Sequence, residues 1–307
     1  MHDLLIIGGG PAGIAAAVYA ARKQLKTILV TEEIGGQSVV SEGIENWIGT
    51  VNIPGSELAK SLEAHIDAYK KDIVEVVKGE RIASLSKDGD QFVATAESGK
   101  TYSAKKVLVA TGAHRRKLKA TGAEQFEHKG LTYCASCDGP LFAGQDVAVI
   151  GGGNAGFETA AQLLAYAKSV TLIHKHKEFK ADPVTVEKVL AHENMKAITN
   201  AMPVEVTGEK FVNGLVIEDN DTKEKTTLNV TGVFLEIGVV PNTSFVKDLV
   251  ELDAVGRIVT NAKNQQTSVP GVWAAGDCTD ELYHQNNIAA GDGVKALEDI
   301  YVHVKTK

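Results

Sequence analysis

The sequence has few cysteines and no long apolar or basic run, and each of these absences excludes a class of protein. Three cysteines in 307 residues are too few for the disulfide framework of a secreted protein. A net charge of −7 without a long basic run argues against nucleic acid as a partner. The longest apolar run, residues 12–21, is too short to span a bilayer. The first residues show neither a basic leader nor a cleavage site, so we expect a cytoplasmic protein that does not bind membranes.

Length and composition predict a globular protein of two domains. A chain of 307 residues is long enough to bury two separate cores. Hydrophobic residues make up 44% of the chain, which is ordinary for such proteins. The 30 glycines exceed the average, as expected where turns approach a ligand closely.

One strand–turn–helix–strand unit occurs twice in the chain. In the first copy, an apolar strand (4–7) precedes a glycine turn (8–13), a helix (14–23) and a second strand (27–30). The second copy has the same parts at residues 147–150, 151–156, 157–167 and 170–173. The two copies match without a gap, with Gly8 opposite Gly151 and Gly13 opposite Gly156. This duplication predicts two similar α/β domains.

Both glycine turns contain the pattern GxGxxG between a strand and a helix, which is the context of dinucleotide binding. The first glycine makes the tight turn, the second lets the backbone approach a pyrophosphate, and the third lets helix and strand pack closely. The phosphates then rest on N–H groups at the helix N-terminus. Two dinucleotides are therefore expected. The alternative is two glycine turns in an α/β sheet without a ligand.

The remaining segments predict how the two domains divide the chain. A helix is expected over residues 57–71 and a long final helix over 286–303. Antiparallel strands are expected at residues 73–77, 91–96 and 101–103, and again at 204–206, 211–219 and 225–230. Buried strands that end in a glycine turn are expected at residues 106–112, 232–238 and 272–277. The simplest topology inserts the second domain into the first, with crossings near residues 112–118 and 239–245.

Cys134 and Cys137 are the most informative pair of side chains. Two residues separate them, so they lie about one helical turn apart and within reach of a disulfide. CxxC spacing lowers thiol pKa values in known dithiol centres, and Asp138 adds a group that can carry a proton. Half of a zinc site, or two small buried residues, are the alternatives. Zinc would need further ligands, and Cys278, the third cysteine, lies far along the chain.

Together these features resemble the low-molecular-weight thioredoxin reductases over essentially the whole chain. The most specific is Cys134-Ala135-Ser136-Cys137-Asp138-Gly139, placed just before the second glycine motif. The other markers are Gly8-x-Gly10-x-x-Gly13 with Pro11 and Ala12, Gly35-Gly36-Gln37, Glu45-Asn46-Trp47, Ala110-Thr111-Gly112-Ala113, the second glycine motif, and Gly276-Asp277 leading to Gln285. The chain is also similar to the C-terminal part of the alkyl hydroperoxide reductase flavoprotein subunit, to which Lys180-Ala181-Asp182 and Pro241-Asn242-Thr243 look closer. That flavoprotein normally carries an additional N-terminal thioredoxin-like region.

The resemblance implies an α/β fold with two Rossmann-like dinucleotide-binding domains of the pyridine nucleotide-disulfide oxidoreductase type, the second inserted in the first. Residues 1–113 and 243–307 would form the discontinuous FAD-binding domain. Residues 114–242 would form the NAD(P)H-binding domain that carries the redox dithiol.

The residues expected to bind FAD all lie in the first domain. They are Gly8, Gly10, Pro11, Ala12, Gly13, Glu32, Gly36, Gln37, Asn46, Thr111, Gly112, Gly276, Asp277, His284 and Gln285. Glu32, with Glu33 beside it, stands where a ribose-binding acid is expected. By resemblance, Gln285 would lie by the isoalloxazine ring. His284 occupies a position where an arginine is common, and Cys278 is expected to be a small buried residue.

The residues expected to bind NAD(P)H lie in the second domain. They are Gly151, Gly153, Asn154, Ala155, Gly156, His174, Lys175, His176, Lys180 and Gly238. An NAD site would have an acid at position 174, whereas the cations that follow would attract the extra phosphate of NADPH. Gly156, in place of the family's usual alanine, favours NADH. A basic solvated loop without selectivity is the alternative; we expect NADPH, with NADH possible.

The resemblance implies that electrons pass from NAD(P)H through FAD and the Cys134–Cys137 disulfide to a thioredoxin-like protein. Cys137 would face the flavin, Cys134 would attack the partner, and Asp138 would move the proton. The inserted domain would rotate between two arrangements, with Gly112 and Gly238 as candidate pivots. A homodimer is the family expectation, and no metal is expected.

Four other functions remain open from the sequence. Three are enzymes: an NADH-dependent reductase of a peroxiredoxin system, a ferredoxin-linked thioredoxin reductase, and an FAD-dependent dithiol oxidase. The second glycine motif argues against the ferredoxin-linked enzyme, and an oxidase would not need the basic loop. The fourth is a nucleotide-sensing protein with an inert CxxC.

Overall fold

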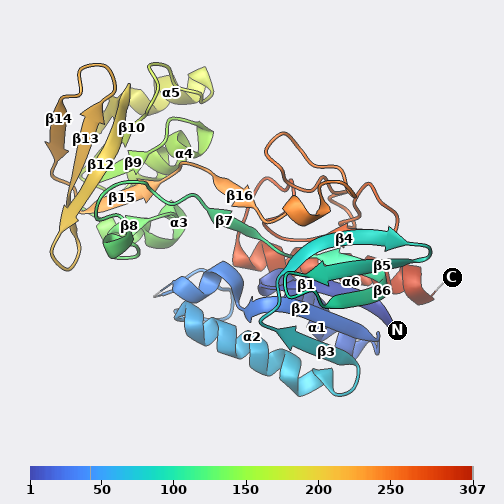
Figure 1. Ribbon diagram of the computed structural model, residues 1–307. Coiled ribbons are helices and arrows are strands. Elements are labelled where there is room, and N and C mark those ends of the chain that lie inside the picture. Colours follow the sequence, from blue (N-terminus) through green and yellow to red (C-terminus); the bar gives the residue numbers. More distant parts are fainter. Residues whose placement is uncertain (42, 306–307) are drawn as a thin grey trace. The chain divides into compact units, whose positions relative to one another are not determined.

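The computed structural model describes residues 1–41 and 43–305 and divides the chain into two units. The first unit comprises Met1–His114 and Val240–Lys307, and the second comprises Arg115–Val239. The chain therefore leaves the first unit once and returns to it once. The two crossings pair with each other as the short strands β7 (Ala113–Arg115) and β16 (Val239–Pro241) (Figure 1).

A seven-stranded mixed sheet forms the centre of the first unit. The strands are β1 (His2–Gly9), β2 (Thr27–Ile34), β3 (Val74–Lys78), β4 (Ile82–Asp88), β5 (Gln91–Ala96), β6 (Thr101–Val109) and β17 (Val272–Ala274). Their order is β3-β2-β1-β6-β5-β4, and β17 also pairs with β6. The pairs among β1, β2, β3, β6 and β17 are parallel, whereas β4, β5 and β6 form an antiparallel ribbon.

The alternation of side chains along β1 places one core on each face of this sheet. Leu4 and Ile6 belong to the core that includes α1 (Pro11–Arg22), α2 (Gly55–Lys70) and α6 (Asn286–Lys305). Leu5 and Ile7 belong to the core on the opposite face, which β4, β5 and the segment 245–258 also enter. A strand covered on both faces reads as a continuous apolar run, which is what residues 4–7 show.

The second unit contains a five-stranded parallel sheet in the order β11-β10-β9-β15-β8. The strands are β8 (Leu131–Thr132), β9 (Asp146–Ile150), β10 (Ser169–Ile173), β11 (Met195–Ile198) and β15 (Gly232–Leu235). One face packs on the helices α3 (Ala135–Asp138), α4 (Asn154–Leu163) and α5 (Pro183–Leu190). The other packs on an antiparallel sheet of β12 (Ala201–Gly208), β13 (Val212–Asp219) and β14 (Lys225–Leu228) (Figure 1).

The predicted α/β fold, with a strand–turn–helix–strand unit in each half, is confirmed, and some details were wrong. The segment at 73–77 was expected to be antiparallel, but β3 pairs with β2 in parallel. The strand β4, the helix α5 and the strand β11 were not expected. The helix α4 ends at Leu163 rather than at residue 167, because the N–H groups of Ala165 and Tyr166 bond to carbonyls three residues back, which tightens the last turn.

Candidate active site

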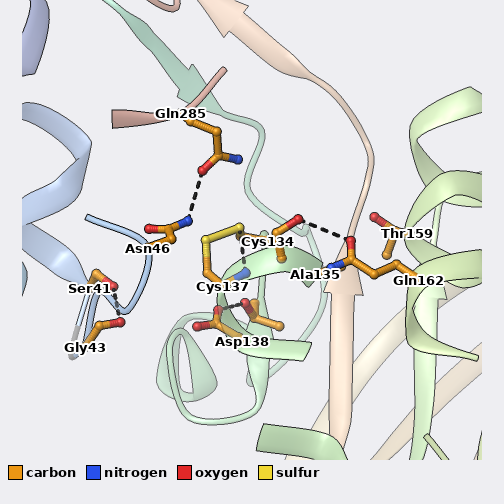
Figure 2. The surroundings of a disulfide bond; sticks show 12 residues. Ser41, Gly43, Asn46, Cys134, Ala135, Cys137, Asp138, Thr159, Gln162 and Gln285 are labelled. Atoms are coloured by element: carbon orange, nitrogen blue, oxygen red, sulfur yellow. Dashed lines mark hydrogen bonds between the residues drawn. A yellow bond between two sulfur atoms is a disulfide. The ribbon is translucent and has the colours of Figure 1, made fainter. Parts of the chain in front are cut away.

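Cys134 and Cys137 form a disulfide at the start of the short helix α3 (Figure 2). Cys134 is the N-cap residue, and its Sγ accepts a hydrogen bond from the Cys137 N–H at 3.1 Å. An N–H directed at sulfur stabilises a thiolate there once the disulfide is reduced. The helix is held at Ala135, which is buried in the core beside α4. Both cysteines are half-buried, so they remain within reach of a reaction partner.

Asp138 ends the helix α3 and lies beside the disulfide (Figure 2). Its Oδ2 accepts a hydrogen bond from the Thr132 hydroxyl. Thr132 is buried on β8, and β8 is paired with β15. The carboxylate is therefore held by the sheet rather than by a free loop. Sequence reasoning identified Asp138 but not Thr132.

The first glycine turn has the geometry that pyrophosphate binding requires. Gly8 has φ of +113°, which a residue with a side chain rarely adopts. A Cβ at Gly13 would lie 1.9 Å from the Gly8 carbonyl oxygen, so this position accepts only glycine. A Cβ at Gly10 would meet nothing within 4 Å. The N-terminus of α1, with Pro11 as its first residue, thus borders open space.

A cavity of about 780 Å³ extends from this turn, within the range of about 300–1,000 Å³ typical of small-molecule sites. The predicted FAD residues that line it are Gly8, Gly10, Pro11, Ala12, Glu32, Gly36, Gln37, Thr111, Gly112, Gly276 and Asp277. Residues that the sequence analysis missed also line it, among them Ser38, Glu80, Arg81, Asn242 and Asn286. Asn286 Oδ1 accepts a hydrogen bond from the Ser38 hydroxyl at 2.9 Å, which joins η1 (Gly36–Val40) to the start of α6.

Asn46, His284 and Gln285, also predicted to bind FAD, do not line this cavity. Asn46 Nδ2 donates to Gln285 Oε1 at 3.1 Å, so the structure brings these two residues together. His284 Nε2 is buried and has no hydrogen-bond partner among the described residues.

Cys278 is completely buried, and burial raises the pKa of its thiol to about 11. Because a thiol with a raised pKa forms little thiolate, we expect Cys278 to be unreactive.

The second glycine turn repeats the geometry of the first. Gly151 has φ of +129°, and a Cβ at Gly156 would lie 1.9 Å from the Gly151 carbonyl oxygen. A Cβ at Gly153 would meet nothing within 4 Å. Asn154, the first residue of α4, accepts a hydrogen bond through Oδ1 from the Asp182 N–H at 2.8 Å. The turn and the N-terminus of α5 are thereby connected.

His174 follows β10 and is buried, with 6% of its surface exposed. Its Nδ1 accepts from the Gly152 N–H at 3.1 Å, and its Nε2 lies 3.0 Å from the Glu178 carbonyl oxygen. A carbonyl can only accept, so Nε2 carries the proton and the ring is neutral. Burial lowers the pKa of His174 in agreement with this assignment. His174 therefore supports the glycine turn, and it contributes no positive charge.

Positive charge beside His174 comes from neighbouring side chains. Lys175, His176 and Lys180 are predicted nucleotide-binding residues, and all three are exposed. Lys177 is paired with Asp221 at 2.8 Å. Lysine thus supplies the cations that follow β10, at the sheet edge where the adenosine ribose of a dinucleotide lies.

Gly112 and Gly238, which were predicted to bind the cofactors and to act as pivots, lie at the crossings between the units. Gly112 has φ of +62° and accepts a hydrogen bond through its carbonyl from the Asn242 N–H at 3.0 Å. Gly238 has φ of +97° and accepts one from the Arg116 N–H at 3.1 Å. Both turns use a conformation that favours glycine.

Neither a membrane-spanning helix nor a metal-binding cluster occurs in the part of the chain that the structure describes. None of its helices is both long and apolar enough to cross a membrane. No three or more of its His, Cys, Asp or Glu side chains gather in a way that could hold a metal ion.

Two glycine-turn units and a redox disulfide define a class of nucleotide-dependent flavoprotein disulfide reductase, and comparison with known proteins agrees. The family model of the pyridine nucleotide-disulphide oxidoreductases matches residues 2–293. The chain belongs to this family, whose thioredoxin reductases use FAD and NAD(P)H.

Individual relatives and structures are also similar over nearly the whole chain. The F subunit of alkyl hydroperoxide reductase from Staphylococcus aureus (strain MRSA252) is 43% identical over 99% of this chain and 59% of the relative. NADH dehydrogenase of Bacillus subtilis (strain 168) is 41% identical over 96% of this chain and 57% of the relative. The crystal structure of thioredoxin reductase from Streptococcus pyogenes MGAS5005 has a TM-score of 0.93 and 34% identity, and covers 100% of this chain and 99% of that chain. The chain thus spans under three fifths of the length of these curated relatives.

The residues present fit both nucleotides. The open spaces beyond Gly10 and Gly153 leave room for a pyrophosphate against each backbone turn. The cavity of the first unit is large enough for a cofactor, and its lining includes Glu32 on β2 and Asp277 shortly after β17. The two turns differ in the charge of the residues at the end of their second strand: Glu32 stands on β2, whereas lysines follow β10.

Proposed function

We propose that the chain is an NAD(P)H-dependent flavoprotein that reduces a disulfide on a thioredoxin-like protein. The observation that carries this proposal is the Cys134–Cys137 disulfide, which lies in the same unit as the second glycine turn. Bound FAD would accept hydride equivalents from NAD(P)H and supply two electrons to this disulfide. We assign FAD to the unit of Met1–His114 and Val240–Lys307, and NAD(P)H to Arg115–Val239.

The reduced dithiol would act by thiol–disulfide exchange. Two electrons and two protons convert the Cys134–Cys137 disulfide into two thiols. Cys134, whose sulfur accepts the Cys137 N–H, attacks the partner disulfide as a thiolate and releases one partner thiolate. Cys137 then attacks Cys134 Sγ, releases the second partner thiolate and restores the disulfide. Asp138, held by Thr132, carries the proton that the exchange requires.

The loop after β10 supports NADPH as the electron donor. Lys175 and Lys180 form no ion pair within the described residues, unlike Lys177, so both are available to a phosphate. NADH is the second candidate, because one relative at 41% identity carries the name NADH dehydrogenase. Initial rates with each nucleotide at equal concentration decide between the two.

A second candidate function is the reductase component of a hydroperoxide-reducing system. The 43% identity to a component of alkyl hydroperoxide reductase supports it. Both candidates use the same dithiol and differ only in the protein that receives the electrons. Neither ferredoxin as the donor, nor oxygen as the acceptor, nor an inert dithiol has such support.

The test is an assay of the FAD-loaded protein with NADPH or NADH as donor and one of three acceptors. The acceptors are an oxidised thioredoxin, a two-cysteine peroxiredoxin with hydroperoxide, and dioxygen alone. Our proposal predicts fast nucleotide oxidation with thioredoxin. Fast oxidation only with the peroxiredoxin pair supports the second candidate, and fast oxidation with dioxygen alone contradicts both.

A further inference from the structure

Glu236 is a partly buried acid at the second glycine turn. It directly follows β15, and its N–H donates to the Ile150 carbonyl of β9 at 2.8 Å. Its own carbonyl oxygen would lie 2.2 Å from a Cβ at Gly151. The backbone of Glu236 therefore touches the first residue of the turn that would hold the pyrophosphate.

The side chain of Glu236 has a defined orientation. Its Oε1 accepts a hydrogen bond from the Thr159 hydroxyl on α4 at 2.7 Å, and Thr159 is itself buried. Oε2 has no hydrogen-bond partner among the described residues. The fold thus holds one carboxylate oxygen in place and leaves the other for a different donor.

The strand order indicates which part of a dinucleotide would supply that donor. The sheet runs β10-β9-β15, and parallel strands end at the same edge. In a dinucleotide-binding unit of this kind, the residues after β9 contact the pyrophosphate. The residues after β10 contact the adenosine ribose. Glu236 follows β15, on the opposite side of the glycine turn from His174. The nicotinamide riboside half must extend in that direction.

The charge around Glu236 suits an acceptor that is partly shielded from water. Burial raises the pKa of Glu236, and Glu158 on α4 acts in the same direction. The Thr159 hydroxyl and Arg115 on β7 oppose this shift. Burial takes water away from the Glu236 carboxylate. A further hydrogen bond from a ligand would therefore stabilise its charged form.

We propose that Glu236, oriented by Thr159, accepts a hydrogen bond from the nicotinamide riboside half of NAD(P)H. The inference rests on the proposed function, since it requires a dinucleotide at the second glycine turn. Two groups of that half can donate, the ribose hydroxyls and the carboxamide NH₂. Glu236 is thus a nucleotide-binding residue, and Thr159 positions it.

The test measures binding to the FAD-loaded protein by titration calorimetry. The probes are NAD⁺, ADP-ribose and ADP. The same three ligands with a phosphate on the 2′-hydroxyl of the adenosine ribose are measured alongside them. For Glu236→Ala we expect affinity for NAD⁺ to fall about tenfold, equivalent to about 1.4 kcal/mol. Affinity for ADP, which lacks the nicotinamide riboside, should be unchanged. Loss of ADP-ribose affinity identifies the ribose as donor, and its retention identifies the carboxamide.

Two variants separate this role from general damage to the turn. Thr159→Val keeps the shape of the side chain and removes the hydroxyl, so we expect a smaller loss confined to the same ligands. Thr159→Ser should retain wild-type affinity. The inference is overturned if Glu236→Ala binds NAD⁺ as tightly as the wild type, or if it loses affinity for ADP equally. If the wild type binds neither NAD⁺ nor NADP⁺, the proposed function itself fails, and the inference with it.

Discussion

The Thr132 hydroxyl donates a hydrogen bond to Asp138 Oδ2 next to the Cys134–Cys137 disulfide. Thr132 is only 4% exposed and lies on a strand of the parallel sheet. Asp138 lies at the end of a helix of four residues, which has little stability of its own. The sheet therefore determines where the Asp138 carboxylate, which we propose carries the proton, lies relative to the sulfurs.

Replacing Thr132 by valine should slow the transfer of electrons to the partner disulfide by about tenfold, because general acid–base catalysis depends on an oriented group. Thr132→Ser keeps the hydroxyl and should restore the rate. Reduction of the flavin by the nucleotide should be unchanged in both variants. Stopped-flow measurement of the two half-reactions checks this. Equal slowing of both half-reactions, or no rescue by serine, would contradict the role assigned to Thr132.

Nucleotide preference should depend on Lys175 and Lys180. The double variant Lys175→Ser/Lys180→Ser should raise the KM for NADPH at least about tenfold and leave that for NADH nearly unchanged, because each hydrogen bond to a charged group contributes about 1.5–3 kcal/mol. Lys177→Ser is the control, since Lys177 is already paired with Asp221 at 2.8 Å. Steady-state kinetics with both nucleotides measure the effect. Equal changes for NADPH and NADH would argue for a loop without selectivity.

Two glycines of the first turn should respond differently to alanine. Gly10→Ala meets no protein atom within 4 Å, so the protein should fold with normal stability and lose FAD, because the new methyl group occupies the space for the pyrophosphate. Gly13→Ala would place Cβ 1.9 Å from the Gly8 carbonyl oxygen, so folding itself should suffer. Flavin content and thermal unfolding together measure this. Full FAD content in Gly10→Ala would place the pyrophosphate elsewhere.

The third cysteine should be silent in thiol titrations. Cys278 is fully buried, and burial raises the pKa of its thiol to about 11, so very little thiolate is present near neutral pH. The oxidised native protein should show no reactive thiol, and unfolding it without reductant should expose one. Cys278→Ala should show none under either condition. A thiol that reacts quickly in the native oxidised protein would contradict this assignment.

Much of the fold could be predicted because its signals are local. The two glycine turns and their flanking apolar runs lie within short stretches, and the repeat shows that the same unit occurs twice. The partner of a strand is not a local property, which explains why β3 was expected to be antiparallel. The helix α5 was missed although Asp182 caps it and Pro183 is its first residue, a combination that is typical of helix starts.

The candidate site shows the same division. The two cysteines, Asp138 and the glycines could be found because their spacing identifies them. Glu236 and Thr159 are 77 residues apart in the chain, and no spacing rule connects them. The neutral state of His174 depends on two backbone contacts, so the sequence could show only that a histidine stands where an acid is usual.

The central claim is that electrons pass through Cys134 and Cys137 to another protein. The most direct measurement compares the FAD-loaded wild type with the double variant Cys134→Ser/Cys137→Ser under anaerobic conditions. Each is first reduced with NADPH and then mixed with an oxidised thioredoxin. We predict that the nucleotide bleaches the flavin in both proteins and that only the wild type then reduces the thioredoxin. Reduction of thioredoxin by the double variant at the wild-type rate would contradict the account.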